Sequence, residues 1–304
     1  MASASSMAGR PTRRLRGGDA RLGWLLVAPL VLVMLALVFV PLGMTLMDSL
    51  YRVDPMRAGQ PFIGLRHYAD LVTDTNVRTS ALNTLGLVVI CVVLETVGGI
   101  AAALLLQRIE KGRMWLLAAL IVPWALPPVV NALVWLWIYN PSVGLLNNLL
   151  LSAGLIGHKM VWFNDKATAL FLVAVVHVWR MLPLTAIIVL AALQSIPTDL
   201  YEAAKLDGAG PVRSFLTITL PLIAGGLGIA MTQSTVFAFN LFDEAWILAG
   251  ASLDTRTVLI QVYMSAFQQL HFSYGMALSV LLMIASLAVS SFYVLNVYRE
   301  TRLD

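Results

Sequence analysis

Charged side chains are scarce in this chain and unevenly distributed. Only 12% of its 304 residues are Asp, Glu, Lys or Arg, against about 25% in an ordinary soluble domain. Four stretches contain none at all, and they lie between Arg21 and Asp48, Arg113 and Lys159, Arg213 and Asp243, and Arg256 and Arg299. Each is longer than the ~20 apolar residues with which an α-helix crosses a bilayer. The sequence therefore predicts an all-α, polytopic membrane protein and excludes soluble domains, a disordered chain and a nucleic-acid-binding protein.

Cysteine is nearly absent and histidine is sparse. The single cysteine, Cys91, lies within an apolar run, so neither an intramolecular disulfide nor a cysteine-based metal site is expected. The histidines are scattered, without paired spacing or an H-E-x-x-H pattern: His67, His158, His177 and His271. We therefore expect Cys91 to be a small buried residue, and we expect no metal site.

A phosphate-binding loop is also missing. No stretch matches G-x-x-x-x-G-K-[ST], and none of the lysines follows a glycine or precedes Ser or Thr. The chain is therefore not expected to be an enzyme or to hold a cofactor. If ATP and Mg drive this protein, another subunit must bind them.

The uncharged stretches predict six membrane spans. We expect them at residues 22–48, 79–107, 115–139, 168–194, 214–242 and 274–298. The basic N-terminus resembles a signal peptide, but the run from Leu22 to Met47 is too long for one, so we interpret it as a retained first helix. The segment 141–166 is interrupted and favours an interfacial helix over a seventh span. The resulting organisation is an N-terminal tail at 1–20 and a single transmembrane domain at 21–304.

Lysine and arginine predict the orientation. With a cytoplasmic N-terminus, the inner side carries twelve of these cations: Arg10, Arg13, Arg14, Arg16, Arg21, Arg108, Lys111, Arg113, Lys205, Arg213, Arg299 and Arg302. The outer side then carries seven: Arg52, Arg57, Arg66, Arg78, Lys159, Lys166 and Arg256. Because cytoplasmic loops carry an excess of Lys and Arg, both termini are expected to be cytoplasmic.

The loop at 195–213, between the fourth and fifth spans, is the most informative stretch. Pro197 ends the incoming span, and Thr198 or Asp199 can cap a new helix. Asp199 and Glu202 have the spacing of a capping box, and Gly208 is a natural helix stop. The loop therefore predicts a short amphipathic helix that faces the cytoplasm and docks onto a soluble partner.

The same loop carries a specific motif. It reads Glu202-Ala203-Ala204-x-x-x-Gly208, followed after nine residues by Ile218-x-Leu220-Pro221. This pattern resembles the E-A-A-x-x-x-G motif of membrane subunits of ATP-binding-cassette (ABC) importers. The resemblance implies that the loop contains the coupling helix, which sits in a cleft of an ATPase subunit. The implied coupling residues are Glu202, Ala203, Ala204, Asp207 and Gly208, with Glu202 in a charged contact and Gly208 at the turn that seats the helix.

The resemblance extends from about residue 20 to 300. Its further elements are Phe62-Ile63-Gly64-Leu65 with His67 and Tyr68, Asn83-Thr84-Leu85, Gly144-Leu-Leu-Asn147, Trp162-Phe163-Asn164-Asp165, Phe239-Asn240-Leu-Phe242-Asp243-Glu244, and Thr255-x-Thr257-Val258-Leu259 with Tyr263, Phe267 and Gly275. These residues are similar to the first permease of maltose and glycerol-phosphate transporters. One departure is Leu248-Ala249-Gly250-Ala251-Ser252, where that family commonly has L-T-G-G-P.

The resemblance implies a function and an assembly. The chain would be the permease subunit of a binding-protein-dependent ABC importer in the bacterial inner membrane, translocating an oligosaccharide or a related polyol or sugar phosphate. Its partners would be a second homologous permease, two ATPase subunits and an extracytoplasmic solute-binding protein. ATP and Mg would be bound by the ATPase subunits.

The resemblance also implies residues that line the substrate pathway: Arg180, Met181, Leu184, Val236, Phe239, Asn240 and Asp243. Aromatic, amide, carboxylate and guanidinium groups suit a sugar. Alternatively, Arg180 pairs with Glu95, Asp243 or Glu244, since charges within a membrane usually pair, and Phe239 is ordinary core. A proton-coupled carrier and a membrane-embedded hydrolase are rival functions, but the sequence shows neither internal repeats nor a catalytic constellation.

Overall fold

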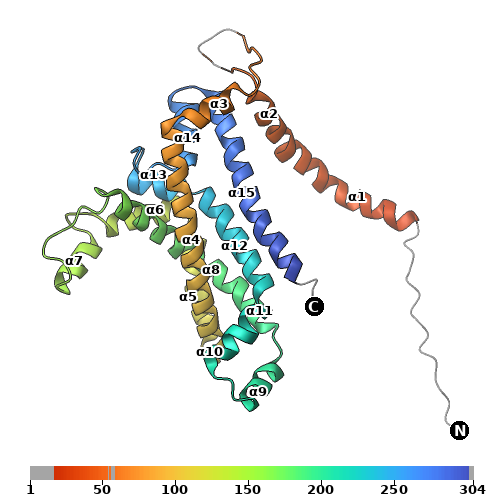
Figure 1. Cartoon of the computed structure of the whole chain (residues 1–304), viewed down its shortest axis with the longest axis vertical. Helices are drawn as coiled ribbons and strands as arrows, with labels where there is room; N and C mark the ends of the chain where they lie inside the picture. The colour runs from red at the N-terminus through yellow and green to blue at the C-terminus, as the bar shows by residue number, and fades with distance from the viewer. Residues whose placement is uncertain (1–16, 54, 56–58, 301–304) are drawn as a thin grey trace.

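The computed structural model describes residues 17–53, 55 and 59–300, and most of them are helical (Figure 1). The only extended pairing among these residues is one isolated bridge between Tyr51 and Phe62. The all-α fold class is therefore confirmed for the described part of the chain. Most of the expected tail at 1–20 lies outside the described residues, as do these cations of the topology argument: Arg10, Arg13, Arg14, Arg16, Arg57 and Arg302.

Four continuous helices are long and apolar enough to cross a membrane. They are Gly23–Asp48, Thr75–Arg108 (α4), Lys166–Gln194 (α8) and Phe272–Leu295, the last within α15 (Phe272–Glu300). The first of them combines α1 (Gly17–Met34), a π-helical turn at Leu35–Phe39 and α2 (Val40–Asp48). These helices match the first, second, fourth and sixth expected spans.

Two of these helices begin at a capping carboxylate. Asp74 Oδ1 accepts a hydrogen bond from the Asn76 N–H at 2.8 Å, just before α4. Asp165 Oδ2 accepts one from the Thr168 N–H, also at 2.8 Å, just before α8. Such caps satisfy backbone donors that have no partner within the helix. The backbone hydrogen bond from Thr168 lowers the pKa of the Asp165 carboxyl.

The third expected span, 115–139, is wrong as a single helix. α5 (Arg113–Ala125) and α6 (Pro128–Ile138) meet at an angle of 94°. Between them, Leu126 and Pro127 are extended, with ψ angles of 137° and 138°. Each of these two residues precedes a proline, whose ring disfavours the helical conformation of the residue before it. A uniformly apolar run is therefore broken into a bent helix pair.

The fifth expected span, 214–242, is broken as well. It comprises α10 (Pro211–Ser214), a π-helical turn (η2, Phe215–Thr219), α11 (Leu220–Leu222) and α12 (Ala224–Phe239). The two parts meet at 70° around Ile223, just after Pro221, which has no N–H to donate within a helix. α12 ends at Phe239, so Asp243 is not on this helix and instead begins α13 (Asp243–Ala249). With each bent pair counted as one span, the described residues contain up to six.

Short helices connect the spans. They are α3 (Arg66–Thr73), α7 (Leu145–Ser152), α9 (Thr198–Leu206), α13 and α14 (Val258–Tyr263), the last continued by a π-helical turn at Met264–Gln268. α7 is far too short to cross a bilayer, in agreement with the expectation that 141–166 holds no seventh span. α13 and α14 were not among the expected helices, and each is shorter than eight residues.

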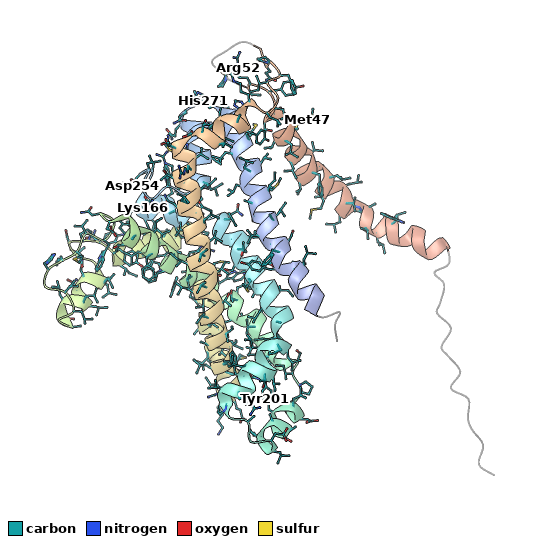
Figure 2. All side chains as sticks on the ribbon, in the orientation of Figure 1. Met47, Arg52, Lys166, Tyr201, Asp254 and His271 are labelled. Carbon is teal, nitrogen blue, oxygen red and sulfur yellow. The ribbon has the colours of Figure 1, made fainter. Side chains whose placement is uncertain are left out.

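The transmembrane body is built around α4 and α8, which pack along each other (Figure 1). A Cβ atom on Gly99 would lie 2.6 Å from Thr185 Cγ2 and 3.3 Å from the backbone nitrogen of Ala186, so a glycine permits this close approach. α12 packs against α4, α8 and α15. By contrast, α1 and α2 extend away from the body, which they contact where α2 meets α15 (Figure 2).

Asn147 holds together the segment between α6 and α8. Its fully buried side chain donates hydrogen bonds to the carbonyls of Pro141 (3.1 Å) and Met160 (2.9 Å), and it accepts one from the Met160 N–H (3.0 Å). A Cβ atom on Gly144 would collide with the backbone of Asn140. The Gly144 and Asn147 positions of the sequence motif are therefore both explained by the backbone of this segment.

Replacing Asn147 with alanine should loosen this segment. The backbone groups of Pro141 and Met160 lose their hydrogen-bond partner, and each lost hydrogen bond contributes about 0.5–1.5 kcal/mol. We expect faster cleavage between 141 and 165 in limited proteolysis of the purified protein. Asn148→Ala is the matched control, since Asn148 is exposed and makes a single 3.3 Å hydrogen bond to the Val143 carbonyl. Equal cleavage of the two variants would contradict the role of Asn147.

Candidate functional site

The loop at 195–213 forms a short helix with a well-defined end. α9 covers Thr198–Leu206. The Gly208 N–H donates to the Lys205 carbonyl (3.1 Å), and the Ala209 N–H donates to the Ala204 carbonyl (2.9 Å). Gly208 itself has a φ of +77°, in the left-handed region. Together these features make a Schellman motif, so the predicted helix stop at Gly208 is confirmed.

The start of α9 differs from the expectation. The residue before the helix is Pro197, and no side chain caps it, so the expected cap by Thr198 or Asp199 is wrong. Pro197 lies in the extended conformation with φ near −61° and ψ near 135°. Thr198 is consequently the first helical residue instead of the residue that precedes the helix. Asp199 still lies in the first turn, where a carboxylate stabilises the positive end of the helix dipole.

One side of α9 contacts the transmembrane body and the other is exposed. The Tyr201 hydroxyl and Thr219 Oγ1 are hydrogen-bonded at 2.9 Å, which ties the helix to the start of the fifth span. On the opposite side, Leu206 is 90% exposed. Of the predicted coupling residues, Ala204 is half-buried, and four are exposed: Glu202, Ala203, Asp207 and Gly208. The loop therefore presents an apolar tip beside acidic groups, a surface that suits a protein partner.

A cluster of ionisable side chains lies at the centre of the transmembrane body. Arg180 on α8 donates from Nε to Glu244 Oε1 on α13 at 2.8 Å, and both side chains are buried. His177, one turn earlier on α8, lies between two carboxylates. Its Nε2 is 3.6 Å from Glu95 Oε1 on α4, and its Nδ1 is 3.9 Å from Glu244 Oε1. We name Glu95, His177, Arg180 and Glu244 the buried polar centre.

The charges of the buried polar centre nearly cancel. Arg180 and Glu244 neutralise each other, while Glu95 is fully buried and approached by His177. An isolated charge in an apolar interior costs several kcal/mol. The centre as a whole is neutral when either Glu95 is protonated beside a neutral His177 or Glu95 is ionised beside a protonated His177. The centre thus joins three helices, α4, α8 and α13, through one set of mutually compensating charges.

Cys91 lies against this centre, which the sequence pattern did not indicate. The ligand atoms of Cys91, Glu95 and His177 all lie within 4.8 Å of one another, and all three side chains are buried. The i, i+4 spacing of Cys91 and Glu95 places them on one face of α4, and that spacing is the signal that could have shown it. The carboxylate and imidazole are accounted for by the charge balance of the centre. The expectation that the chain holds no metal ion stays a prediction.

The predicted pathway residues lie where α8, the end of α12 and the start of α13 meet. Arg180, Met181 and Phe239 are buried, whereas the others are more open: Leu184, Val236, Asn240 and Asp243. Phe239 belongs to the hydrophobic core, as its alternative interpretation holds, and Arg180 forms the alternative ion pair with Glu244. The Arg180–Glu244 ion pair joins α8 to the start of α13, and contact of the seven predicted residues with a substrate stays a prediction.

Comparison with known proteins relates this architecture to one family. The family model "Binding-protein-dependent transport system inner membrane component" matches residues 95–302. The chain is 33% identical over 283 residues, 93% of its length and 95% of the relative's, to the trehalose/maltose transport system permease protein MalF of Thermococcus litoralis. It is 31% identical, over 88% of its length and 85% of the relative's, to the trehalose transport system permease protein SugA of Mycobacterium tuberculosis.

A solved structure shares the fold. A chain of a bacterial ABC transporter involved in the import of the acidic polysaccharide alginate superposes with a TM-score of 0.78, at 22% identity, over 93% of this chain and 98% of that one. The overall arrangement of helices is therefore shared with that chain.

Proposed function

Because the chain belongs to the family of inner membrane components of binding-protein-dependent transport systems, we propose that it is the permease subunit of an ABC importer for a carbohydrate. The observation that carries this function is the family match across 95–302, which includes both the exposed helix α9 and the buried polar centre. The trehalose and maltose permeases among its relatives favour an oligosaccharide over a monosaccharide. The chain itself performs transport and no bond chemistry.

We propose that the chain crosses the bacterial inner membrane six times with both termini in the cytoplasm. The bent pairs α5–α6 and α10–α12 supply the third and fifth spans. α2 ends and α15 begins at the end of the molecule that carries α3, so the start of α1 and the end of α15 both lie away from that end (Figure 1). An even number of spans fits this arrangement, and residues 21–304 form one transmembrane domain with the coupling loop at 195–213.

The surfaces of the chain support a multi-subunit assembly. α1 and α2 contact the rest of the chain mainly where α2 meets α15, so we propose that their exposed apolar side chains pack against a second, homologous permease and lipid. The exposed side of α9, with Glu202 and the tip at Leu206, docks into an ATPase subunit. Two ATPases and an extracytoplasmic solute-binding protein complete the complex. ATP and Mg are bound by the ATPases, and no cofactor belongs to this chain.

Transport then follows from alternating access. Closure of the ATPases around ATP moves α9, and the Tyr201–Thr219 hydrogen bond passes this displacement to the start of the fifth span. The region where α8, α12 and α13 meet opens to the outside and receives the sugar from the binding protein. Leu184, Val236, Asn240 and Asp243 are the partly open residues that contact the sugar there.

The energy source is the direct test of this function. The cognate binding protein is first screened for the sugar that raises its melting temperature most, because a ligand stabilises the folded state that binds it. With that sugar radiolabelled, uptake into proteoliposomes that hold the complete transporter should require internal ATP and Mg and persist when an uncoupler collapses the proton gradient. Uptake that runs on a proton gradient without ATP would establish the rival function of a proton-coupled carrier.

A further inference from the structure

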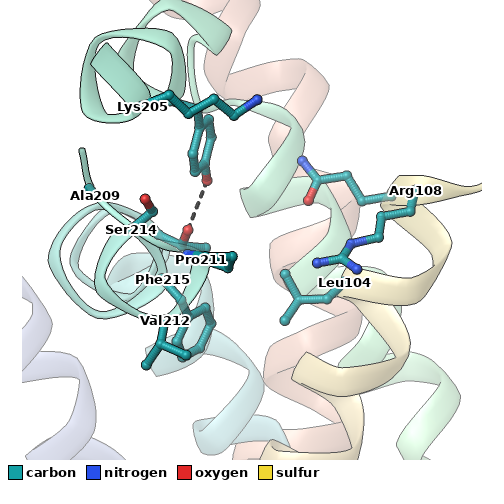
Figure 3. A pocket seen from close by; sticks show the side chains of 11 residues that line it. Leu104, Arg108, Lys205, Ala209, Pro211, Val212, Ser214 and Phe215 are labelled. Atoms are coloured by element: carbon teal, nitrogen blue, oxygen red, sulfur yellow. Dashed lines mark hydrogen bonds between the residues drawn. The ribbon is translucent and has the colours of Figure 1, made fainter. Parts of the chain in front are cut away.

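A cavity of about 610 Å³ lies between the end of α4 and the segment that contains α9 and α10 (Figure 3). Its walls come from two stretches far apart in sequence. One is the end of α4, with Leu104, Gln107 and Arg108, and the other is the segment 201–219, with Tyr201, Lys205, Ala209, Pro211, Val212, Ser214, Phe215 and Thr219. The predicted pathway residues are not among them. The cavity is therefore separate from the proposed sugar pathway, although Tyr201 and Lys205 belong to the coupling helix.

The polar side of the cavity is cationic. Arg108 and Lys205 both line it, from α4 and α9 respectively, and no acidic residue does. Among the described residues, neither cation has a carboxylate oxygen within 4.0 Å. Gln107, the residue before Arg108, also lines the cavity and adds a neutral amide. Two cations and neutral hydrogen-bonding groups form a surface complementary to an anionic phosphate or carboxylate group.

The remaining wall is apolar and faces outward. Leu104 on α4 and Phe215 in η2 line the cavity together with Val212, which is 72% exposed. Arg108 is the last residue of α4, so the cations stand where this span leaves the apolar region of the membrane. A ligand that fits both walls has an anionic head and a hydrocarbon portion.

We propose that this cavity binds an anionic glycerophospholipid of the cytoplasmic leaflet. The phosphate lies between Arg108 and Lys205, and an acyl chain runs along Leu104 and Phe215. Basic pockets at the cytoplasmic ends of transmembrane helices bind anionic headgroups on this principle. The proposal rests on the cytoplasmic placement of α9, which is part of the proposed function, and it adds a ligand that this function does not require.

A lipid in this position would act on coupling. Its headgroup bridges α9 to the end of α4, beside the Tyr201–Thr219 hydrogen bond, whose two residues line the same cavity. The bound lipid therefore holds α9 at a fixed distance from the transmembrane body. Sugar-stimulated ATP hydrolysis by the complete complex is consequently expected to be higher in membranes that contain anionic lipid.

The test compares two double variants of the purified, delipidated complex. Arg108→Gln/Lys205→Gln removes both cavity cations, whereas Lys111→Gln/Arg213→Gln removes two exposed cations of the same region that do not line the cavity. Binding of dioleoyl-phosphatidylglycerol is measured by native mass spectrometry. Each cation near a membrane surface contributes about 1 kcal/mol to anionic lipid binding, so the cavity variant should bind about 30-fold more weakly and the control variant nearly normally.

Four results would overturn the proposal. One is an equal loss in both double variants, which would indicate general electrostatics. Another is equal binding of dioleoyl-phosphatidylcholine, and the third is displacement of the lipid by inorganic phosphate, which would assign the cavity to a free anion. Cross-linking of Lys205 to an ATPase carboxylate in the intact complex would show that a protein side chain occupies the site instead. The binding measurement uses neither ATP nor sugar, so its failure leaves the uptake test of the proposed function unaffected.

Discussion

Replacing Glu244 with alanine is expected to prevent stable folding and assembly of this permease. The substitution leaves the Arg180 guanidinium buried without the carboxylate that accepts its 2.8 Å hydrogen bond. Removing one partner of a buried ion pair costs about 3–5 kcal/mol, a large part of the 5–15 kcal/mol by which folded proteins are typically stable. The loss should appear as a low yield of monodisperse protein in detergent and a lowered melting temperature.

The matched control for this variant is Asp243→Ala. Asp243 adjoins Glu244 in the first turn of α13 but is only half-buried, and no ion pair or side-chain hydrogen bond among the described residues involves its carboxylate. Its loss should leave folding close to normal and lower sugar uptake, since Asp243 is a proposed pathway residue. If Asp243→Ala destabilised the protein as much as Glu244→Ala, the specific role of the Arg180–Glu244 pair would be contradicted.

A double variant separates the structural role of Arg180 from contact with the substrate. Arg180→Met/Glu244→Leu removes both charges together, and apolar replacement of a buried pair is often neutral or stabilising. The melting temperature should therefore recover. If Arg180 also binds the sugar, the recovered protein assembles but transports poorly. Normal uptake by the stable double variant would remove Arg180 from the pathway and leave it only the role of joining α8 to α13.

The spans that the sequence predicts correctly are those in which one continuous helix covers the whole apolar run. Hydropathy locates α4, α8 and α15 because their ends carry charges or capping carboxylates such as Asp74 and Asp165. It fails at 115–139 because Leu126 is as apolar as its neighbours, and only the following pair of prolines fixes its extended backbone. The same limit applies at Ile223, where the 70° bend follows Pro221.

The partners within the site were less predictable than its location. Arg180 is recognisable as costly within a membrane, but Glu95, Asp243 and Glu244 were all possible partners. The choice depends on where α12 ends: because the helix stops at Phe239, a new helix begins at Asp243 and carries Glu244 inward. The coupling loop was predictable in more detail, since its motif and its glycine stop are local in sequence, whereas its contact to Thr219 depends on tertiary packing.

Replacing Gly208 with proline is expected to abolish uptake while the subunits still assemble. Proline fixes φ near −65°, whereas Gly208 has a φ of +77°. Proline also lacks the N–H that Gly208 donates to the Lys205 carbonyl. Both the conformation and one hydrogen bond of the Schellman motif are lost, so α9 can no longer end in the position that seats it in the ATPase. In proteoliposomes we expect uptake to fall by at least about 100-fold, equivalent to about 2.8 kcal/mol.

A graded series shows whether this loss comes from the backbone. Gly208→Asn should retain most uptake because asparagine tolerates the left-handed conformation, whereas Gly208→Ala pays about 1–2 kcal/mol for it. Gly210→Ala is the matched control: nothing lies within 4 Å of a Cβ atom at either glycine, but Gly210 is extended with a φ of −73°. The predicted order of uptake is therefore Gly210→Ala, Gly208→Asn, Gly208→Ala and Gly208→Pro.

The readout that distinguishes uncoupling from unfolding is ATP hydrolysis by the assembled complex. Because Gly208 lies at an exposed end of α9 and not in the buried polar centre, basal hydrolysis and co-purification with the ATPase should survive in Gly208→Ala. Stimulation of hydrolysis by the sugar-loaded binding protein should decrease in parallel with uptake, since both depend on the position of α9. If Gly208→Pro took up sugar at the normal rate, the end of α9 would have no part in transmitting force from the ATPase.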